Sequence, residues 1–362
     1  MKAVVMAGGE GTRLRPLTSN QPKPMVPVFN KPIMLYIIEL LKKHRLTDIV
    51  VTLQFMPQII RNYFGDGGDI GVDLSYAVEQ HPLGTAGSVK NAQDHLDKTF
   101  LVISGDALTD IDLTKLIQFH KHKRAMATIA LKRVENPLEF GVVIANEDGQ
   151  IERFLEKPTW GEIFSDTINT GIYVLEPEIF SYIPEGENVD FSKDVFPKVL
   201  EDGKPIYGFV ADGYWCDVGN YEQYVQAHQE IMQGKADIQP PGIKMREDIW
   251  VGEGAYIDPS ADIDGPVVIG PHVRLEKDVE IHELSVIGSN VVLKEGAHIH
   301  RSIIWENTYV GSQTHLHGCV IGKNCDIRSG ARVEQGVVVG DECVIEDNAT
   351  INHDVKIYPF KT

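Results

Sequence analysis

Glycine and basic residues are concentrated near the start of the chain, in KAVVMAGGEGTRLRPLT and in the QPKPM that follows shortly after. The apolar residues 3–6 predict a buried strand, after which Gly8, Gly9 and Gly11 allow a sharp turn whose backbone N–H groups can approach a ligand. Residues 1–31 carry five basic side chains against one acid, whereas the whole protein has a formal net charge of −18. A local cationic loop on an acidic protein indicates a small polyanionic ligand.

Two common phosphate-binding loops are excluded by residues at fixed positions. The dinucleotide fingerprint G-x-G-x-x-G requires a glycine where Leu14 stands, and the acid expected about 20 residues later is missing. The Walker A sequence G-K-[ST] does not occur. The third candidate is a loop whose arginine and a distant lysine grip a triphosphate while chemistry occurs at the α-phosphate. Arg13 and Lys23, the latter between Pro22 and Pro24, are the cations that this loop requires.

Two aspartates from distant segments are the predicted metal ligands. Asp106 ends the apolar strand FLVISGD, and Asp217 lies in YWCDVGN. Two carboxylates fit a Mg²⁺ ion that bridges phosphates and keeps most of its waters. Asp112, by contrast, is the first residue of DLTKLIQFH, where it is expected to cap a helix.

Residues 1–233 alternate strand-like and helix-like stretches, which predicts an α/β domain. Such alternation implies a mostly parallel sheet covered by helices on both faces, with ligands at the carboxyl ends of the strands. Residues 234–247, which contain two prolines, form the predicted linker. The predicted strands include 48–53, 72–78, 99–105 and 126–132, and the predicted helices include 31–44, 86–96, 113–122 and 221–232.

In residues 248–362, apolar residues instead recur at every sixth position. Ten apolar residues, each six apart, run from Val251 to Trp305, and after a slip the pattern resumes from Ile321 to Ile357. This spacing predicts a parallel β-helix with a narrow triangular interior. The same register places Cys325 and Cys343 in that interior as inert thiols. The histidines of HIHR and HLHG could bind zinc, but surface histidines at turns are the favoured interpretation.

Length and composition restrict the possible functions. A chain of 362 residues is expected to form two domains. A pI near 5.1 argues against broad nucleic-acid or membrane binding, because no large basic face is expected. The N-terminus shows no signal-peptide pattern, no run of about 18 apolar residues occurs, and the cysteines form no C-x-x-C pair. We therefore expect a reduced, cytoplasmic protein.

The motifs together resemble the sugar-1-phosphate nucleotidyltransferases, also called NDP-sugar pyrophosphorylases. GGEGTRLRPLT is similar to the family signature, and it is followed in order by PKPM, PLGTAGS, SGDAL, FGVV, EKP, NTGIY and YWCDVGN. The resemblance covers the whole chain. It implies a Rossmann-like, mixed and mostly parallel sheet followed by a left-handed β-helix, a layout most similar to that of mannose-1-phosphate guanylyltransferases.

The resemblance also implies a role for each matching residue. It makes Arg13, Lys23, Asp106 and Asp217 catalytic, with the two aspartates as Mg²⁺ ligands. The nucleotide-binding residues that it implies are Ala7, Gly8, Gly9, Gly11, Thr12, Arg13, Lys23, Glu79, Gly84 and Thr85. The implied sugar-phosphate residues are Gly141, Glu156, Lys157, Asn169 and Thr170.

The chemistry of this family needs no catalytic histidine or serine. The nucleophile is a sugar-1-phosphate oxygen that is already ionised at pH 7, so positioning and positive charge are sufficient. GTP and mannose-1-phosphate are the expected substrates, with uridylyl, adenylyl or thymidylyl transfer as alternatives, and a homo-oligomer through the β-helix is expected. A non-catalytic regulatory subunit and an acyltransferase activity in the β-helix stay open as further alternatives.

Glu79 is the residue on which the choice of nucleobase depends. In related thymidylyl- and uridylyltransferases an amide side chain stands five residues before the glycine of the G-[TL]-A stretch and reads the base. Counting back from Gly84 gives Glu79, whose carboxylate can accept the two donors on one edge of guanine. The alternative is that Glu79 points to solvent and that Gln80 reads the base.

Overall fold

The computed structural model describes residues 1–137, 140–156, 165–246 and 248–362. The chain divides into two compact units. The first consists of Met1–Glu10 and Met34–Trp215, and the second consists of Gly11–Ile33 and Cys216–Thr362. The second unit therefore contains both the β-helix and the segment that follows the glycine loop.

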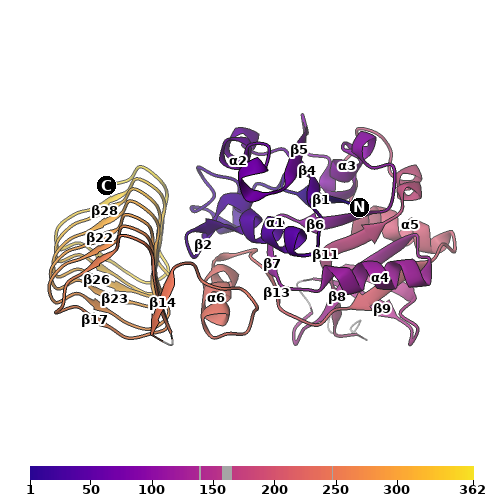
Figure 1. Ribbon diagram of the computed structural model, residues 1–362. Coiled ribbons are helices and arrows are strands. Elements are labelled where there is room, and N and C mark those ends of the chain that lie inside the picture. The colour runs from indigo at the N-terminus through magenta and orange to yellow at the C-terminus, as the bar shows by residue number, and fades with distance from the viewer. Residues whose placement is uncertain (138–139, 157–164, 247) are drawn as a thin grey trace. The chain divides into compact units, whose positions relative to one another are not determined.

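A mixed sheet forms the centre of the first unit. In the described residues its nine strands are β1 (Lys2–Met6), β4 (Asp48–Leu53), β5 (Asp73–Val78), β6 (Phe100–Ser104), β8 (Ala127–Arg133), β9 (Gly141–Ala145), β10 (Ile151–Glu156), β11 (Thr167–Leu175) and β12 (Ile206–Val210). The main order is β10-β9-β11-β6-β1-β4-β5, and β8 joins β11 to β12. Strands β6, β1, β4 and β5 are parallel, whereas β11 is antiparallel to β6 (Figure 1).

Helices cover this sheet, as the alternating pattern predicts. They are α1 (Ile33–Lys43, which begins at the unit boundary), α2 (Pro57–Phe64), α3 (Gly84–Lys90), α4 (Leu113–Lys123) and α5 (Phe196–Glu201). One hydrophobic core joins α3 and α5 to the same face of the sheet, through residues such as Val4, Val50 and Val102. The predicted cap of α4 is confirmed, because the Asp112 carboxylate accepts a hydrogen bond from the Lys115 N–H at 3.0 Å. Among the residues described, no helix is both long and apolar enough to cross a bilayer.

The second unit consists of a short hairpin, a helix and a β-helix. The hairpin pairs β2 (Pro27–Val28) with β3 (Lys31–Pro32), and the helix is α6 (Tyr221–Met232). Two further short strands are β7 (Ala107–Thr109), in the first unit, and β13 (Trp215–Asp217), at the unit boundary. The β-helix follows α6 and accounts for most of the unit.

Three sheets of short strands form the β-helix, which confirms the prediction from the period of six. The first sheet contains β14 (Ile243–Arg246), β15 (Ile249–Val251), β18 (Val267–Ile269), β21 (Ser285–Ile287), β24 (Ile303–Ile304), β27 (Val320–Ile321), β30 (Val338–Val339) and β33 (Lys356–Ile357). The second contains β16 (Tyr256–Ile257), β19 (Arg274–Leu275), β22 (Val292–Leu293), β25 (Tyr309–Val310), β28 (Asp326–Ile327) and β31 (Val344–Ile345). The third contains β17 (Asp262–Ile263), β20 (Glu280–Ile281), β23 (His298–His300), β26 (His315–His317), β29 (Arg332–Val333) and β32 (Thr350–Ile351). All these pairings are parallel except that of β14 with β15.

One predicted interior position was wrong. Ile287 pairs with Ile304, so Ile304 occupies the interior position that the period of six assigns to Trp305. Two corners, between β23 and β24 and between β26 and β27, are each one residue shorter than the other corners that lead into the first sheet, and the first of them advances the register at Ile304. Trp305 is buried at 3% exposure, yet it lies outside the β-helix core, and its indole N–H donates to the Tyr224 hydroxyl at 2.9 Å.

Both predicted interior cysteines lie in the β-helix core. Cys325 and Cys343 are unpaired and belong to the β-helix core. Burial raises the pKa of the Cys325 thiol to about 12, so the reactive thiolate is scarce at neutral pH.

The histidines of the third sheet stack along one face. The rings of His298 and His315 lie 4.6 Å apart and nearly parallel, and those of His300 and His317 lie 4.9 Å apart. Within the described ranges, no group of three or more His, Cys, Asp or Glu side chains is arranged to hold a metal ion. The favoured interpretation placed these histidines at turns, whereas all four lie on the strands β23 and β26, where they are half-buried or exposed.

Candidate active site

A cavity of about 320 Å³ lies in the first unit, at the carboxyl ends of β1, β4, β5 and β6. Parallel strands bring their carboxyl ends to one edge of the sheet, which is where ligands of such folds bind. The residues that line the cavity are Met6, Gly8, Gly9, Gln54, Glu79, Pro82, Leu83, Gly84, Thr85, Ser88, Ser104, Asp106 and Asn188. Six of these were predicted as site residues from the sequence.

The glycine loop begins directly after β1. The Ala7 N–H donates to the Thr52 carbonyl at 3.0 Å, which extends the pairing of β1 with β4 by one residue. A Cβ atom on Gly8 would lie 3.3 Å from the Gln54 Cβ and 3.4 Å from a Glu79 carboxylate oxygen, whereas one on Gly9 would meet nothing within 4 Å. Glycine at position 8 thus lets the backbone pass close to Glu79 at the cavity wall.

Glu79 is buried and lines the cavity, with 8% of its surface exposed. One carboxylate oxygen accepts from the Ser88 hydroxyl at 2.6 Å, and the other accepts from the Leu83 N–H at 3.1 Å. A carboxylate oxygen has two lone-pair sites, so each oxygen can accept a second hydrogen bond. Gln80 is exposed and is not among the lining residues.

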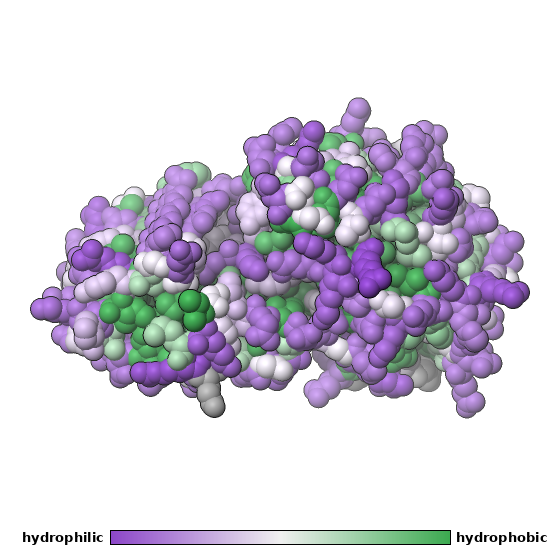
Figure 2. Space-filling view, viewed as in Figure 1, coloured by the Kyte–Doolittle hydropathy of each residue, from purple (hydrophilic) through white to green (hydrophobic). Residues whose placement is uncertain are grey.

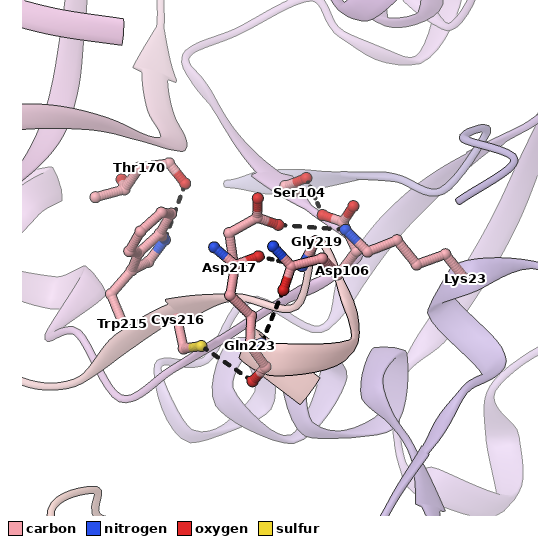
Figure 3. Close-up of polar contacts among 10 residues, drawn as sticks. Lys23, Ser104, Asp106, Thr170, Trp215, Cys216, Asp217, Gly219 and Gln223 are labelled. Atoms are coloured by element: carbon pink, nitrogen blue, oxygen red, sulfur yellow. Dashed lines mark hydrogen bonds and ion pairs between the residues drawn. The ribbon is translucent and has the colours of Figure 1, made fainter. Parts of the chain in front are cut away.

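Asp106, Gly84 and Thr85 complete the predicted residues around the cavity. One oxygen of Asp106 accepts from the Ser104 hydroxyl at 2.5 Å (Figure 3). Gly84 has φ +72°, and a Cβ there would lie 2.5 Å from the Val189 carbonyl oxygen, so the turn requires glycine. The Thr85 hydroxyl donates to Asp190 and accepts from the Phe191 N–H, both at 2.9 Å, so its part in this structure is to hold the loop.

The remaining signature residues belong to the second unit. Gly11 has φ +64°, and a Cβ there would lie only 2.7 Å from the Lys23 Cβ, so glycine is needed both for the turn and for the close approach. The Thr18 hydroxyl donates to the Gly11 carbonyl at 2.8 Å. Thr12 opens a short 3₁₀ helix, Thr12–Leu14, which presents Arg13 as an exposed side chain.

Lys23 and Asp217 form an ion pair across 194 residues of sequence (Figure 3). The ammonium and carboxylate lie 3.2 Å apart, and Lys23 is 6% exposed. Arg13 is close to this pair, because a Cβ on Gly219 would lie 2.9 Å from an Asp217 oxygen and 3.0 Å from an Arg13 guanidinium nitrogen. The structure thus brings together the three predicted charged residues of this unit around Gly219.

The predicted metal ligands have the chemistry that Mg²⁺ requires. Asp106 borders the cavity of the first unit, and Asp217 pairs with Lys23 in the second. Hard carboxylate oxygens suit Mg²⁺, which in nucleotide sites takes one or two carboxylates and completes its shell with phosphates and water. Asp106 in the first unit and Asp217 in the second each offer a carboxylate of this kind.

Four of the five predicted sugar-side residues occupy three neighbouring strands. Gly141 begins β9 and pairs with Glu156 at the end of β10, and β9 also pairs with β11, which carries Asn169 and Thr170. The Asn169 amide donates to the Tyr173 and Ser192 hydroxyls and accepts from the Gly171 N–H. The Thr170 hydroxyl is buried and donates to the Ala130 carbonyl at 2.7 Å. Lys157 lies outside the described residues.

Several residues that line the cavity were not predicted from the sequence. Gln54 directly follows β4, so the rule that ligands bind beyond strand ends could have identified it. Ser88 and Ser104 hold the Glu79 and Asp106 carboxylates. Asn188 gives no local signal, because only the fold brings it to the cavity.

Comparisons with known proteins identify the family of the chain. A family model described as "Nucleotidyl transferase" matches residues 2–234, and one described as "EIF2B subunit epsilon LbH domain" matches residues 246–351. A UTP–glucose-1-phosphate uridylyltransferase from Synechocystis sp. is 37% identical over 92% of this chain and 90% of its own. A mannose-1-phosphate guanylyltransferase from Mycobacterium tuberculosis is 35% identical over 94% of this chain and 96% of its own. The structure of HddC from Yersinia pseudotuberculosis complexed with GMP-PN is 27% identical, has a TM-score of 0.55, and covers 62% of this chain and 97% of that one.

The chain therefore belongs to the nucleotidyl transferase family. It is a sugar-1-phosphate nucleotidyltransferase, and its curated relatives include both uridylyltransferases of glucose-1-phosphate and guanylyltransferases of mannose-1-phosphate.

Proposed function

We propose that this protein transfers a guanylyl group from GTP to mannose-1-phosphate, giving GDP-mannose and pyrophosphate. The observation that carries the proposal is the buried carboxylate of Glu79 at the wall of the cavity. Guanine presents N1–H and an exocyclic amine on one edge, two donors that a carboxylate can accept as a fork. Uracil and thymine present carbonyl oxygens there, which a carboxylate would repel.

The proposed reaction is an in-line displacement at the α-phosphorus. A phosphate oxygen of the sugar-1-phosphate forms the new P–O bond, and the bond to the bridging oxygen of pyrophosphate breaks. The nucleophile is ionised at neutral pH, so no side chain has to remove a proton. The protein contributes position and positive charge.

Arg13 and Lys23 are the groups that we assign to the triphosphate. The glycines after β1 bring backbone N–H groups to the nucleotide, while the guanidinium and ammonium stabilise charge that moves onto pyrophosphate. Asp106 and Asp217 would hold Mg²⁺, which when bound neutralises phosphate charge. Lys157, with Gly141, Glu156, Asn169 and Thr170, is proposed to bind the sugar phosphate.

A substrate panel tests the proposal directly. Pyrophosphate release is measured with GTP, UTP, ATP, CTP and dTTP, each against mannose-, glucose- and N-acetylglucosamine-1-phosphate. We expect the highest kcat/KM for GTP with mannose-1-phosphate. A preference for UTP or dTTP would overturn the assignment, and release with none of the pairs would favour the non-catalytic alternative.

Glu79→Gln should weaken the preference for GTP over UTP. An amide can accept only one of the two guanine donors, so selectivity should fall by roughly 1–3 kcal/mol. Ser88→Ala is the matched control, because it removes one hydrogen bond to Glu79 and leaves the carboxylate in place. Equal GTP-to-UTP ratios of kcat/KM in the wild type and Glu79→Gln would show that Glu79 only braces the loop.

Uridylyl transfer to glucose-1-phosphate is the second candidate. The observation that favours it is the 37% identity to the uridylyltransferase from Synechocystis sp.. The two candidates differ in base and sugar but share the reaction, so the substrate panel separates them.

We also propose that copies of the chain associate through the β-helix unit. Its strand β14 is the edge of the first sheet, and Ile243 and Met245 on it are 73% and 65% exposed. Figure 2 shows hydrophobic residues gathered on the visible face of this unit. An open edge with apolar side chains is suited to pairing with a second copy. Sedimentation should show an oligomer for the wild type and smaller species for Ile243→Glu/Met245→Glu, and unchanged sedimentation would place the interface elsewhere.

A further inference from the structure

The segment that carries Arg13 and Lys23 is part of the same compact unit as the β-helix. Its last part is the hairpin of β2 and β3, whose turn residues Phe29 and Asn30 have positive φ angles of 46° and 67°. A segment with so little secondary structure needs outside contacts to hold one conformation. Those contacts come from α6 and from the β-helix.

The Tyr224 hydroxyl connects the hairpin to the β-helix. Tyr224 is fully buried on α6, and its hydroxyl donates to the Pro27 carbonyl at 2.6 Å. The same hydroxyl accepts from the Trp305 indole N–H at 2.9 Å. Trp305 directly follows Ile304, the interior residue after the shortened corner, and itself lies outside the β-helix core. One oxygen atom thus joins the β-helix, α6 and the chain four residues beyond Lys23.

The hairpin turn has two further anchors. The His228 ring donates from Nδ1 to the Tyr224 carbonyl at 2.9 Å, and its Nε2 accepts from the Phe29 N–H at 3.4 Å. Burial lowers the pKa of His228 to about 4, so the ring is neutral and can accept this bond at physiological pH. The Asn30 amide donates to the carbonyl of Ile287 in the β-helix at 3.3 Å.

A separate contact holds the start of the segment. The Asn20 side chain hydrogen-bonds the carboxylate of Asp341, a β-helix residue that is 2% exposed. Asp341 also accepts from the Lys323 N–H at 3.1 Å. The β-helix therefore contacts the segment on both sides of Lys23, at residues 20 and 30.

We propose that Tyr224 and Trp305 are positioning residues for the transferase reaction, and that the β-helix through them sets the position of Lys23. The inference rests on the proposed function, which assigns Lys23 and Arg13 to the triphosphate. It goes beyond that function by giving the β-helix a direct part in turnover within one chain.

The chain between Lys23 and Pro27 is stiff enough to transmit a displacement. Lys23 stands between Pro22 and Pro24, which fix their own φ angles, and it opens the 3₁₀ helix Lys23–Met25. The Val26 N–H closes this turn on the Lys23 carbonyl at 3.0 Å. A shift of Pro27 is therefore passed to the ammonium group, and a misplacement of about 1 Å in such a site can cost up to about 100-fold in rate.

Tyr224→Phe tests the inference, with Thr308→Val as the matched control. Both changes remove one buried hydroxyl that donates to a carbonyl and accepts from an N–H, but the partners of Thr308, Gly322 and Cys325, both lie inside the β-helix. The measurements are kcat and KM for both substrates of the full-length protein, its thermal unfolding, and hydrogen exchange of residues 11–33.

We expect Tyr224→Phe to lower kcat on the order of tenfold with little change in the sugar-phosphate KM, and to speed exchange in residues 11–33. Thr308→Val should lower stability by a similar amount while leaving kcat and this exchange unchanged. Trp305→Phe should act like Tyr224→Phe, and the double variant should be no worse than Tyr224→Phe alone, because both act through one oxygen.

Equal kcat values for Tyr224→Phe and Thr308→Val, with equal exchange in residues 11–33, would overturn the inference and leave Tyr224 a packing residue. A wild-type protein that transfers no nucleotide to any sugar phosphate would overturn the proposed function instead. The exchange comparison would in that case still decide whether the Tyr224 hydroxyl holds the segment.

Discussion

Replacement of Asp106 by asparagine should lower kcat by about 100-fold or more while the protein stays folded. Asp106 lines the cavity at the end of β6 and already accepts a hydrogen bond from Ser104. Asparagine has the same size and keeps an oxygen for Ser104, so the change removes mainly the negative charge. Without that charge the site loses a carboxylate ligand for Mg²⁺, whose stabilisation of phosphate charge is worth several kcal/mol.

The measurement is steady-state pyrophosphate release across a range of Mg²⁺ concentrations, together with thermal unfolding. Asp112→Asn is the control, since it makes the same change of charge at the cap of α4, where asparagine is an equally good cap. It should leave both kcat and stability close to wild type. Wild-type turnover in Asp106→Asn at ordinary Mg²⁺ would remove Asp106 from the metal site.

The sheet and the β-helix could be predicted because each depends on a short-range pattern. Apolar runs that alternate with helical stretches defined β1, β4, β6 and β8, and a period of six defined the coils. The error at Trp305 shows the limit of such patterns. Ile304 and Trp305 follow a corner that is one residue shorter, and both are hydrophobic, so the sequence pattern does not decide which of them points inward. The pairing of Ile287 with Ile304 decides it.

The site could be predicted residue by residue only where the motifs matched a known family. The pairing of Lys23 with Asp217 joins residues 194 positions apart, and no local pattern contains that information. Nor does the sequence show that the Thr85 and Thr170 hydroxyls are used for internal hydrogen bonds. Such bonds depend on the complete fold, because each needs a partner from another strand or loop.

Arg13→Ala should lower kcat more than it raises the KM for the sugar phosphate. Arg13 is exposed at the start of the second unit, and its guanidinium lies near Asp217 and Gly219. In the proposed reaction it faces the charge that moves onto pyrophosphate, so it binds the transition state more tightly than the ground state. The loss of one such contact costs on the order of 3 kcal/mol, or about 100-fold in kcat.

A second variant, Gly219→Ala, tests whether the position of the Arg13 guanidinium matters as well as its charge. In Gly219→Ala the new Cβ would lie 2.8 to 3.0 Å from the ends of the Gln223, Asp217 and Arg13 side chains. These flexible ends can move away, so stability should change little while kcat falls because Arg13 and Asp217 are displaced. The part of this loss that acts through the guanidinium should disappear in an Arg13→Ala background, so Gly219→Ala should have a smaller effect there than in the wild type. Arg15→Ala, which removes the same charge two residues along the loop, should keep most of the turnover. An Arg13→Ala variant that changed only the sugar-phosphate KM would place the guanidinium on the sugar side of the reaction.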